Sequence, residues 1–573
     1  MTRSSGRLAS GQRLLVVVLL STVPLVVPPA AGPADDDPPA PPRMTQTAVS
    51  APRHASGGDA ELAQAALAAE DKRLLTLVGS VPFGSGPYVQ TVGAVDTLVL
   101  TPRGVGYGLP DLVALQAAAV QPDGGVLLTR NVLVAPGARL AIDAPGTSLR
   151  LRSEQSGFVS LVAWKAVLTL SGADGAPLGV SSWDPALGDT DSDVVDGRAY
   201  IRDVSGDLQL RNVNASALGF WAGRTSGVAW TGSSGTVATG SIVASTFAGN
   251  QYGVFASRAK DLSVTGSSFT ANTVDGLALH RGTVGTTIRS SSASGNGRHG
   301  FSVDKGSESA VFTDVTAAGN AAFGIFFDGR PLSRGGSPGG ASLRAYGNVQ
   351  IVGGVLRDNG NAGLRVVGGH DVSVSGTRVM DNHDGIALTD TAAPTTVQNV
   401  VVTGRHRLGI SVTGGQAAVA GNRVTGARTA IRVRDAAVAV RDNVVARATN
   451  HAVSVVGAAR GSALLGNTIS GRGPSGLDTF RLAPGVSVRS SGNDVEGWTQ
   501  DRNDWNYWST FIPNHPMLVL WVLVLGLQLR FAVSGRRRRG PVGTAPYPDM
   551  LPQAQAAPLR VDVGRRVPIS GPS

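Results

Sequence analysis

One short phrase recurs between residues 250 and 480 and constrains the fold of this chain more than any other feature. It is an asparagine, a few residues, a glycine and then alternating apolar positions, as in Asn272-Thr-Val-Asp-Gly276-Leu. The glycine recurs at positions 253, 276, 300, 324, 363, 385 and 409, and alanine or glycine occupies the same place at 430, 452 and 476. Apart from one step of 39 residues, the steps are 21 to 24 residues long. A fixed period of this length predicts a solenoid of stacked repeats.

Each period holds about three short runs of alternating valine, isoleucine and leucine, such as residues 262–264 and 277–279. This pattern predicts one coil of a parallel β-helix with three strands, right-handed as parallel crossovers are. A leucine-rich repeat has a similar length, but its Leu-x-x-Leu-x-Leu phrase is absent. Stacked asparagines can bridge the backbones of adjacent coils, and glycine permits a positive φ in the turn. We therefore expect an all-β, single-stranded right-handed parallel β-helix over residues 126–497, with coils of about 22–24 residues.

The open ends of such a solenoid need covers. Helical patterns at residues 59–75 and 109–120 are candidates at the first end, within an N-terminal helical cap region that we place at residues 59–125. Residues 486–508, with their tryptophans, are the candidate at the second end. The single long step places an inserted loop at residues 328–346, and such insertions often mark a binding side.

Both termini carry membrane or export signals. Three arginines precede the apolar run 14–27 and small residues follow it, which predicts a secretory signal peptide, with a retained anchor as the alternative. A second apolar run at 516–533 is followed by four arginines at 536–539, which predicts a spanning helix with its basic side inside, or else a buried or interfacial helix. The expected order is signal peptide 1–34, disordered linker 35–58, cap region 59–125, β-helix 126–497, juxtamembrane segment 498–515, transmembrane helix 516–533 and basic disordered cytoplasmic tail 534–573. The expected location is the cell membrane, single-pass, with the β-helix body on the extracellular side.

Composition excludes several classes of protein. The chain has no cysteine, which rules out disulfide frameworks, cysteine-based metal sites and cysteine nucleophiles. The net charge is +10, and part of it lies in the C-terminal tail, so we expect no nucleic-acid partner. Composition leaves the oligomeric state open.

Polar residues gather on the two coils after Gly276 and Gly300. Asp275 and His299 each precede the glycine of their coil and so share a slot, while His280 and Lys305 follow at offsets of four and five residues. Because successive coils place equivalent side chains about 4.8 Å apart, this pattern predicts two imidazoles, a carboxylate and an ammonium within a few ångströms. The neighbouring candidates for substrate binding are Asp275, Arg281, Asp328 and Arg330. The segment 381–384 resembles a site, but it lies in a turn slot and is interpreted as turn chemistry.

At these residues the sequence resembles the mannuronan C5-epimerases that modify alginate in the periplasm, within the wider group of carbohydrate-binding β-helix proteins. The family carries a Tyr-Gly-x-Asp-Pro-His-Asp phrase and, one coil later, a His-Gly-Ile-x-x-x-Arg phrase. The corresponding residues here are Asp275-Gly276-Leu277-Ala278-Leu279-His280-Arg281 and His299-Gly300-Phe301-Ser302-Val303-Asp304-Lys305. The resemblance covers about residues 126–329, and the later coils match only generically.

The resemblance implies a role for three residues. His280 matches the catalytic base, His299 the second histidine, and Lys305 the arginine that neutralises the uronate carboxylate. The implied reaction removes a weakly acidic proton next to that carboxylate, which a cation and a histidine base would both assist. It requires neither a metal nor another cofactor.

Three functions remain open at this point. Returning the proton on the opposite face of the sugar gives C5 epimerisation, and expelling the 4-O substituent gives β-elimination by a lyase. The third is a non-catalytic polysaccharide-binding or export scaffold, favoured by Asp275 in place of the family's tyrosine and by Ala278 and Arg281 in place of its two aspartates. In all three the expected partner is an acidic polysaccharide.

Overall fold

The computed structural model describes residues 57–81, 86–233, 235–333 and 342–501, together with residues 517, 520, 521, 523–525, 527, 528 and 530. The expected signal peptide 1–34, all but the last residues of the linker 35–58, and the tail 534–573 lie outside the described residues.

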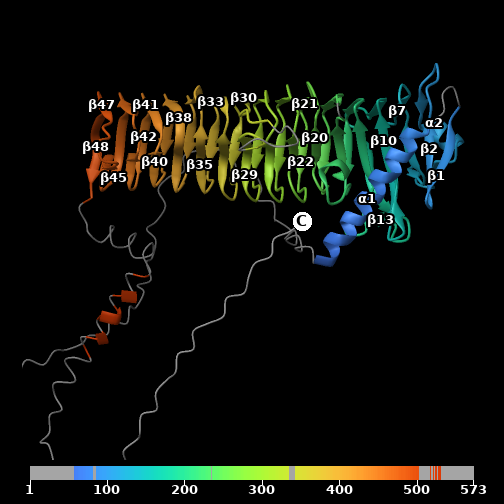
Figure 1. The fold of residues 1–573 in the computed structure, drawn as a ribbon, viewed down its shortest axis with the longest axis horizontal. Coiled ribbons are helices and arrows are strands. Elements are labelled where there is room, and N and C mark those ends of the chain that lie inside the picture. Colours follow the sequence, from blue (N-terminus) through green and yellow to red (C-terminus); the bar gives the residue numbers. More distant parts are fainter. Residues whose placement is uncertain are drawn as a thin grey trace, which may run out of the picture. The chain divides into compact units, whose positions relative to one another are not determined.

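The described chain winds into a long parallel β-solenoid (Figure 1), which confirms the predicted fold. Each coil contributes one strand to each of three sheets, named here A, B and C, and equivalent strands of successive coils pair in parallel, as β23 (Leu277–His280) does with β26 (His299–Val303).

Sheet A contains β2 (Val95–Leu100), β6 (Asn131–Val134), β10 (Ser160–Trp164), β14 (Tyr200–Val204), β17 (Val228–Thr231), β20 (Val254–Ser257), β23, β26, β29 (Phe323–Gly329), β32 (Ala362–Gly368), β35 (Asp384–Thr391), β38 (Leu408–Ala420), β40 (Thr429–Arg434), β43 (His451–Gly457) and β46 (Ser475–Leu482), with β1 (Tyr88–Val92) antiparallel to β2. Sheet B contains β3 (Tyr107–Gly108), β7 (Arg139–Asp143), β11 (Val167–Ser171), β15 (Asp207–Arg211), β18 (Thr239–Val243), β21 (Ser263–Thr265), β24 (Thr287–Arg289), β27 (Val311–Thr313), β30 (Gly347–Val352), β33 (His370–Ser375), β36 (Thr395–Gln398), the end of β38, β41 (Ala437–Arg441), β44 (Ala463–Leu465) and β47 (Arg489–Ser491). Sheet C contains β5 (Val126–Leu128), β8 (Ser148–Glu154), β12 (Leu178–Asp184), β16 (Val213–Ser216), β19 (Thr246–Ala248), β22 (Ser268–Thr270), β25 (Ser292–Ser294), β28 (Thr316–Ala318), β31 (Val355–Arg357), β34 (Arg378–Met380), β37 (Val401–Thr403), β39 (Arg423–Thr425), β42 (Val444–Ala448), β45 (Thr468–Gly473) and β48 (Asp494–Gln500), with β4 (Ala118–Val120), β9 (Gly157–Phe158) and β13 (Asp189–Thr190) in antiparallel contacts.

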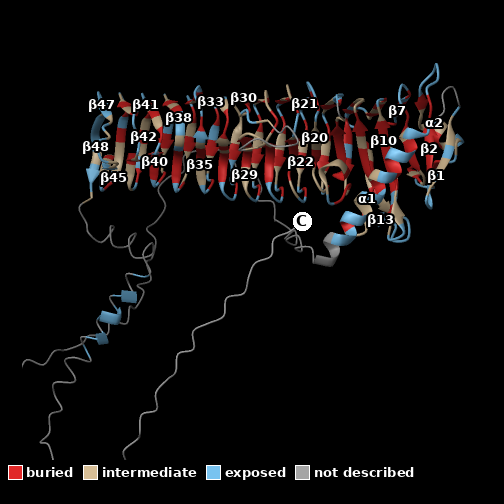
Figure 2. Cartoon of the chain, viewed as in Figure 1, coloured by how far each residue is buried: buried red, intermediate tan, exposed pale blue. Residues whose placement is uncertain are grey.

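The hydrophobic core runs the length of the solenoid, as the buried rows in Figure 2 show. Successive side chains of a strand point to opposite faces. In β23 Leu277 and Leu279 therefore enter the core, while Ala278 and His280 face outward from sheet A. The outer face of sheet A is consequently free to carry polar side chains.

Asparagine ladders bind the coils together at the turns, as the repeat predicts. Asn296 is 1% exposed, and its Nδ2 donates to the Phe269 carbonyl at 3.1 Å and to Asn320 Oδ1 at 2.8 Å. The same ladder runs from Asn250 to Asn382 on the turn before sheet A. A second ladder, from Asn422 to Asn493, lies on the turn before sheet C.

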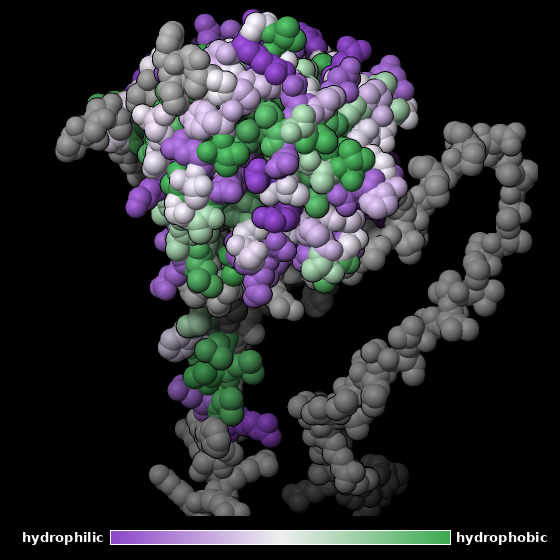
Figure 3. All heavy atoms as spheres, turned by 90° about the vertical axis from the view of Figure 1, so that its right-hand side faces the viewer, coloured by the Kyte–Doolittle hydropathy of each residue, from purple (hydrophilic) through white to green (hydrophobic). Residues whose placement is uncertain are grey.

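The N-terminal region differs from the prediction in two ways. The stack begins at β2, which pairs in parallel with β6, so strands already occupy the region expected to be a helical cap. Helix α2 (Leu109–Ala114) does cover the core, because its Leu112 is fully buried there, but the chain then turns into β4 rather than continuing as helix to residue 120. Figure 3 looks onto this end, where hydrophobic residues form small groups among hydrophilic ones.

Helix α1 (Gly57–Gly79) lies on the outer face of sheet A instead of covering an open end. Its Leu74 and Leu77 are buried against the outward residues Val99, Leu133 and Tyr200 of the first coils. Arg73 donates to Glu70 in a buried pair, and Tyr200 donates its hydroxyl to the same carboxylate. The helix therefore occupies the face that later coils leave open.

The C-terminal end is closed by β47 and β48, whose Trp498 packs against the core. The inserted loop lies between β29 and β30, as expected. Within the segment expected to span a membrane, the described residues of 517–530 are helical and exposed. No helix among the described residues is long and apolar enough to cross a membrane.

Candidate functional site

Three columns of outward side chains cross sheet A at the coils of β20, β23, β26 and β29. Their order follows from the strand register, continued by one or two residues beyond the paired positions. The edge column holds Tyr252, Asp275, His299 and Phe323, the middle column holds Phe255, Ala278, Ser302 and Phe326, and the far column holds Ser257, His280, Asp304 and Asp328. The predicted shared slot of Asp275 and His299 is therefore present.

The two imidazoles lie in different columns. His280 ends β23 in the far column, opposite Asp304, whereas His299 begins β26 in the edge column, with the middle column between them. Lys305 follows Asp304 by one residue and lies in the turn beyond the strand. The expected convergence of two imidazoles and one amine is thus not observed, because residues one before and four after the glycine lie at opposite ends of a short strand.

Asp275 is fully buried and organises the edge column. It accepts hydrogen bonds from Arg298 Nε at 2.8 Å, Arg298 Nη2 at 2.5 Å, the His299 backbone N–H at 3.0 Å and Ser302 Oγ at 2.8 Å. The hydrogen bond to Asp275 raises the pKa of Arg298 further above its ordinary value. The chain itself thus supplies all four of these donors to the Asp275 carboxylate. Arg298 is the member of this pair that reaches the surface, and its side chain is 44% exposed.

The ring of His299 packs against two phenylalanine rings. It stacks on Phe323 at 5.1 Å and on Phe326 at 4.8 Å between centroids, and the residue is 7% exposed. Burial lowers its pKa to about 4, with Arg298 adding to the effect and Asp275 opposing it. Its Nδ1 is buried and has no hydrogen-bond partner among the described residues. His299 is therefore a neutral ring at neutral pH.

His280 and Tyr252 flank Phe255. The ring centroid of Phe255 is 5.5 Å from that of His280 and 5.7 Å from that of Tyr252. Burial lowers the pKa of His280, and the charges of Arg281 and Arg298 lower it further. Burial raises the pKa of Tyr252, and the charge of Asp275 adds to the increase. At neutral pH the site thus pairs a neutral imidazole, which can accept a proton, with a protonated phenol, which can donate one.

Asp304 adds a titratable carboxyl beside His280. Its pKa is raised to about 6, mainly by burial and also by the charges of Asp275 and Asp328, while Arg298 opposes the increase. Arg298 thus acts electrostatically on Tyr252, His280, His299 and Asp304.

The remaining residues that the sequence predicts for the site lie at its margin. Asp328 accepts from Arg330 Nε at 2.8 Å and Nη2 at 2.6 Å, so this pair is satisfied internally. Arg281 is exposed in the turn after β23, and Lys305 makes no side-chain hydrogen bond or ion pair to other described residues. Sequence reasoning missed Arg298, Tyr252 and Asp304. Tyr252 precedes Gly253 as Asp275 precedes Gly276, so the repeat alone would have placed it in the edge column.

The first coils wall off one side of this site. Arg224, in the short helix η1 (Gly223–Thr225), pairs with Asp71 of α1 at 2.6 Å. Gly223 packs on the Phe255 ring so closely that a Cβ there would lie 2.2 Å from it. Among the described residues, α1 and η1 thus cover the outer face of sheet A on the N-terminal side of the site.

Two family models match parts of the chain. Residues 200–337 match the model of the right-handed beta helix region, and residues 332–473 match that of the periplasmic copper-binding protein NosD. No curated protein sequence matches the chain significantly. The fold is thus that of a right-handed parallel β-helix.

Several solved structures are similar. The periplasmic alginate epimerase AlgG is 14% identical, with 74% of this chain and 95% of that chain covered and a TM-score of 0.47. The A-module of the Azotobacter vinelandii mannuronan C-5 epimerase AlgE4 is 15% identical, with 64% and 91% covered and a TM-score of 0.39. The catalytic domain of a GH87 alpha-1,3-glucanase is 12% identical, with 71% and 70% covered and a TM-score of 0.37.

The described residues do not fit a copper centre of the kind that the second model's name suggests. Within its match, His370 Nδ1 contacts Asp371 at 2.6 Å, both ring nitrogens of His406 contact backbone carbonyls, and His451 Nδ1 contacts the Ser475 carbonyl. No group of three or more metal-binding side chains occurs in the described part of the chain.

Proposed function

We propose that the outer face of sheet A around Arg298 binds a uronate residue of an acidic polysaccharide, and that the chain acts on it as a C5-epimerase-like enzyme. The observation that carries the proposal is the position of Arg298. It is held from behind by the buried Asp275, its Nη1 makes no hydrogen bond to the described residues, and its charge acts on both His280 and Tyr252. Arginine matches the planar carboxylate better than Lys305 would.

The sugar ring would stand edge-on over Phe255, with one face toward His280 and the other toward Tyr252. An aromatic ring offers a sugar an apolar platform, and the two titratable groups stand on either side of it. Arg298 would hold the C5 carboxylate and stabilise the negative charge that it gains during the reaction.

The proposed steps conserve protons and electrons. His280, as the neutral base, takes the C5 proton, and the C5–H electron pair moves into the carboxylate to give an enediolate beside Arg298. Tyr252 then returns a proton to C5 from the other side, and the electron pair re-forms a C–H bond with inverted configuration. Solvent restores the protonation of both residues. Removing the base is expected to cost roughly 10²–10⁴-fold in rate.

Two alternatives remain as outcomes of the test. A lyase would use the same base and cation and expel the 4-O substituent. A non-catalytic binding scaffold is favoured by one observation, that the ring nitrogens of His280 have no hydrogen-bond partner among the described residues to orient them.

We also propose where the protein is located in the cell. The basic and apolar N-terminal pattern supports export, the name of the matching periplasmic family agrees with it, and the apolar run 516–533 supports a membrane tether with the β-helix outside.

The test measures the exchange of the C5 proton of the uronate for deuterium. Poly-mannuronate is incubated with the full chain in D₂O, and NMR follows deuterium at C5 and the appearance of guluronate. The wild type is expected to show both, His280→Ala neither, and the exposed-turn control His383→Ala both. Exchange that survives in His280→Ala contradicts the assigned base. Unsaturated chain ends indicate a lyase, and binding without exchange indicates a scaffold.

A further inference from the structure

Four residue types of the candidate site recur near the far end of the same sheet. In the first set Ser302 Oγ and Arg298 donate to the buried Asp275, beside His299. In the second set Ser454 Oγ donates to Asp478 at 2.9 Å, and Arg481 pairs with the same carboxylate. Asp478 is 2% exposed, and His451 Nε2 lies 3.6 Å from its Oδ2.

The histidine and the serine of the two sets use the same positions of their coils, whereas Asp478 lies in the middle column one coil after Ser454 and Asp275 in the edge column one coil before Ser302. Through successive pairings His451 falls in the edge column with His299, and Ser454 falls in the middle column with Ser302. The two coils are six steps apart in these pairings, about 29 Å at ~4.8 Å per step. A linear polymer that runs along sheet A would pass both sets.

Arg432 lies on the coil before His451 and Ser454 and is a cation outside the second set itself. It pairs with Ser454 across the sheet, is half-buried in the middle column, and forms no side-chain hydrogen bond or ion pair with other described residues. Burial lowers its pKa, as do the charges of Arg434, Arg407 and Arg481. A partly desolvated guanidinium among like charges carries a cost that an anionic ligand would offset.

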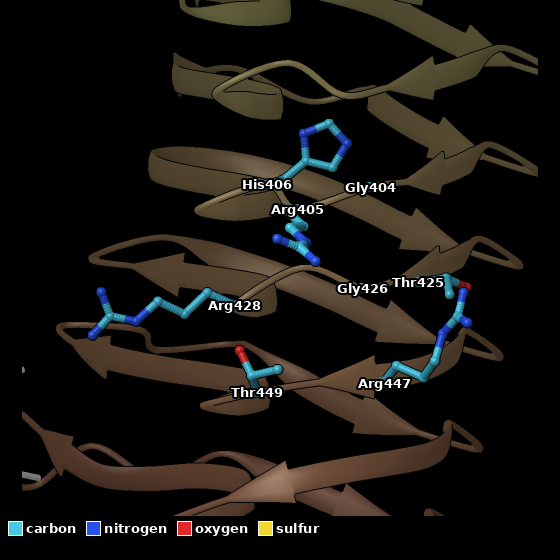
Figure 4. Close-up of a pocket in the computed structure, with 8 residues that line it drawn as sticks. All are labelled: Gly404, Arg405, His406, Thr425, Gly426, Arg428, Arg447 and Thr449. Atoms are coloured by element: carbon cyan, nitrogen blue, oxygen red, sulfur yellow. The ribbon is translucent and has the colours of Figure 1, made fainter. Parts of the chain in front are cut away.

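A pocket lined by three arginines adjoins this edge of sheet A. Arg405, Arg428 and Arg447 come from three successive coils, and Figure 4 shows Arg428 and Arg447 extending in opposite directions with Arg405 between them. None of the three forms an ion pair with the described residues. The asparagine ladder of this turn ends just before the pocket, where His406 takes the next place and contacts the Asn382 carbonyl at 2.7 Å. The surroundings of His451 are therefore basic on two sides.

We propose that the coil of His451 carries a second binding site for a carboxylate-bearing sugar of the polymer that the His280 site engages, with Arg432 as the group that binds the carboxylate and His451 and Ser454 beside it. This inference rests on the proposed function, because it assumes the same acidic polysaccharide. The position of α1 and η1 supports it, because these helices cover the first coils of sheet A and, among the described residues, the sheet continues from the first site toward the second. Two sites on one rigid rod raise the affinity for a long chain by multivalency.

The test measures how many sugar ligands each protein molecule binds. Calorimetry measures the binding of a mannuronate tetrasaccharide, too short to span six coils, and of poly-mannuronate to the full chain. The wild type is expected to bind two tetrasaccharides, and to bind the polymer on the order of 100-fold more tightly than one tetrasaccharide. Arg432→Ala and Arg432→Gln are expected to bind one tetrasaccharide and to lose most of the gain for the polymer. Arg441→Ala removes the same charge from an exposed position on sheet B and is expected to behave as wild type.

The outcomes separate the two proposals. One tetrasaccharide on the wild type, or two on both Arg432 variants with folding confirmed by circular dichroism, overturns the second site and leaves the first intact. Absence of any uronate binding by the wild type overturns the proposed function, and this inference with it.

Discussion

At the scale of single residues, the proposed role of His280 as the base is the easiest to test. Burial and two nearby arginines lower its pKa below the ordinary 6.5. The base must be neutral, so the rate is lost only as pH falls through this lowered value. We expect the acidic limb of the kcat/KM profile to have its midpoint below pH 6.5, and to be absent from any residual activity of His280→Ala. A midpoint above pH 6.5 would contradict the assignment.

His299 makes a separate prediction about stability. Its pKa is about 4 in the folded chain and about 6.5 when unfolded, so the unfolded state binds more protons between these values and stability falls as pH falls from 6.5 to 4. The shift corresponds to roughly 3 kcal/mol at pH 4. His299→Phe keeps an aromatic ring between Phe323 and Phe326 and removes this loss.

The measurement is urea unfolding of both proteins at pH 7 and pH 4. The difference between them cancels the opposite contribution of Asp304, whose raised pKa of about 6 stabilises the fold as pH falls through 6. An equal loss in wild type and variant would show that His299 is not buried as a neutral ring.

Part of the site could be predicted from the repeat. The slot shared by Asp275 and His299 follows from counting residues to the glycine. Arg298 was missed because its importance comes from a buried ion pair across coils, which the period does not specify. The resemblance assigns the role of the cation to Lys305, but the strand ends before this residue, and Asp304 takes the place opposite His280.

At the scale of elements, the asparagine ladder is the feature on which the stack depends. Asn320 Oδ1 accepts from the backbone N–H of Asn296 at 3.1 Å, and its Nδ2 donates to the Ala293 carbonyl at 3.1 Å. Asn320→Ala removes these hydrogen bonds from two buried backbone groups, and a buried polar group that loses its partner costs about 1–3 kcal/mol. We therefore expect a loss of roughly 2–5 kcal/mol in the free energy of unfolding, measured in urea.

The matched control is Asn214→Ala, at an exposed position of β16, which is expected to change stability by less than about 0.5 kcal/mol. Equal effects of the two substitutions would mean that the ladder contributes nothing beyond ordinary side-chain burial.

The two helices show which structural features the sequence pattern leaves undetermined. Residues 59–75 and 109–120 both have helical signals, and both regions do begin as helices. The pattern does not say what a helix packs on. Leu74 and Leu77 of α1 find apolar outward residues on sheet A, so the helix lies along the face, whereas α2 gives way after Ala114 to a strand that pairs with β5.

At the scale of the whole molecule, the solenoid presents the outer face of sheet A as one long surface, and we propose that a linear ligand binds along it. Helix α1 covers the outer face of sheet A at the first coils, the His280 site follows it, and the arginine-bearing coils lie beyond. The period of 21 to 24 residues predicts this rod from the sequence alone. The sequence places the candidate residues on the strands of sheet A, but it could not predict that α1 covers this face at the first coils, because the docking of a surface helix depends on the side chains that it meets.

The most direct test of the central claim is the binding of poly-mannuronate to the full chain with and without Arg298. Calorimetry on Arg298→Ala is compared with Arg289→Ala, which removes an exposed arginine from sheet B of the same region. We expect at least a tenfold weaker affinity for Arg298→Ala, because it loses a charge-assisted contact to the carboxylate worth roughly 1.5–3 kcal/mol, and wild-type affinity for Arg289→Ala. Unchanged affinity in Arg298→Ala, or equal losses in both variants, would contradict the account.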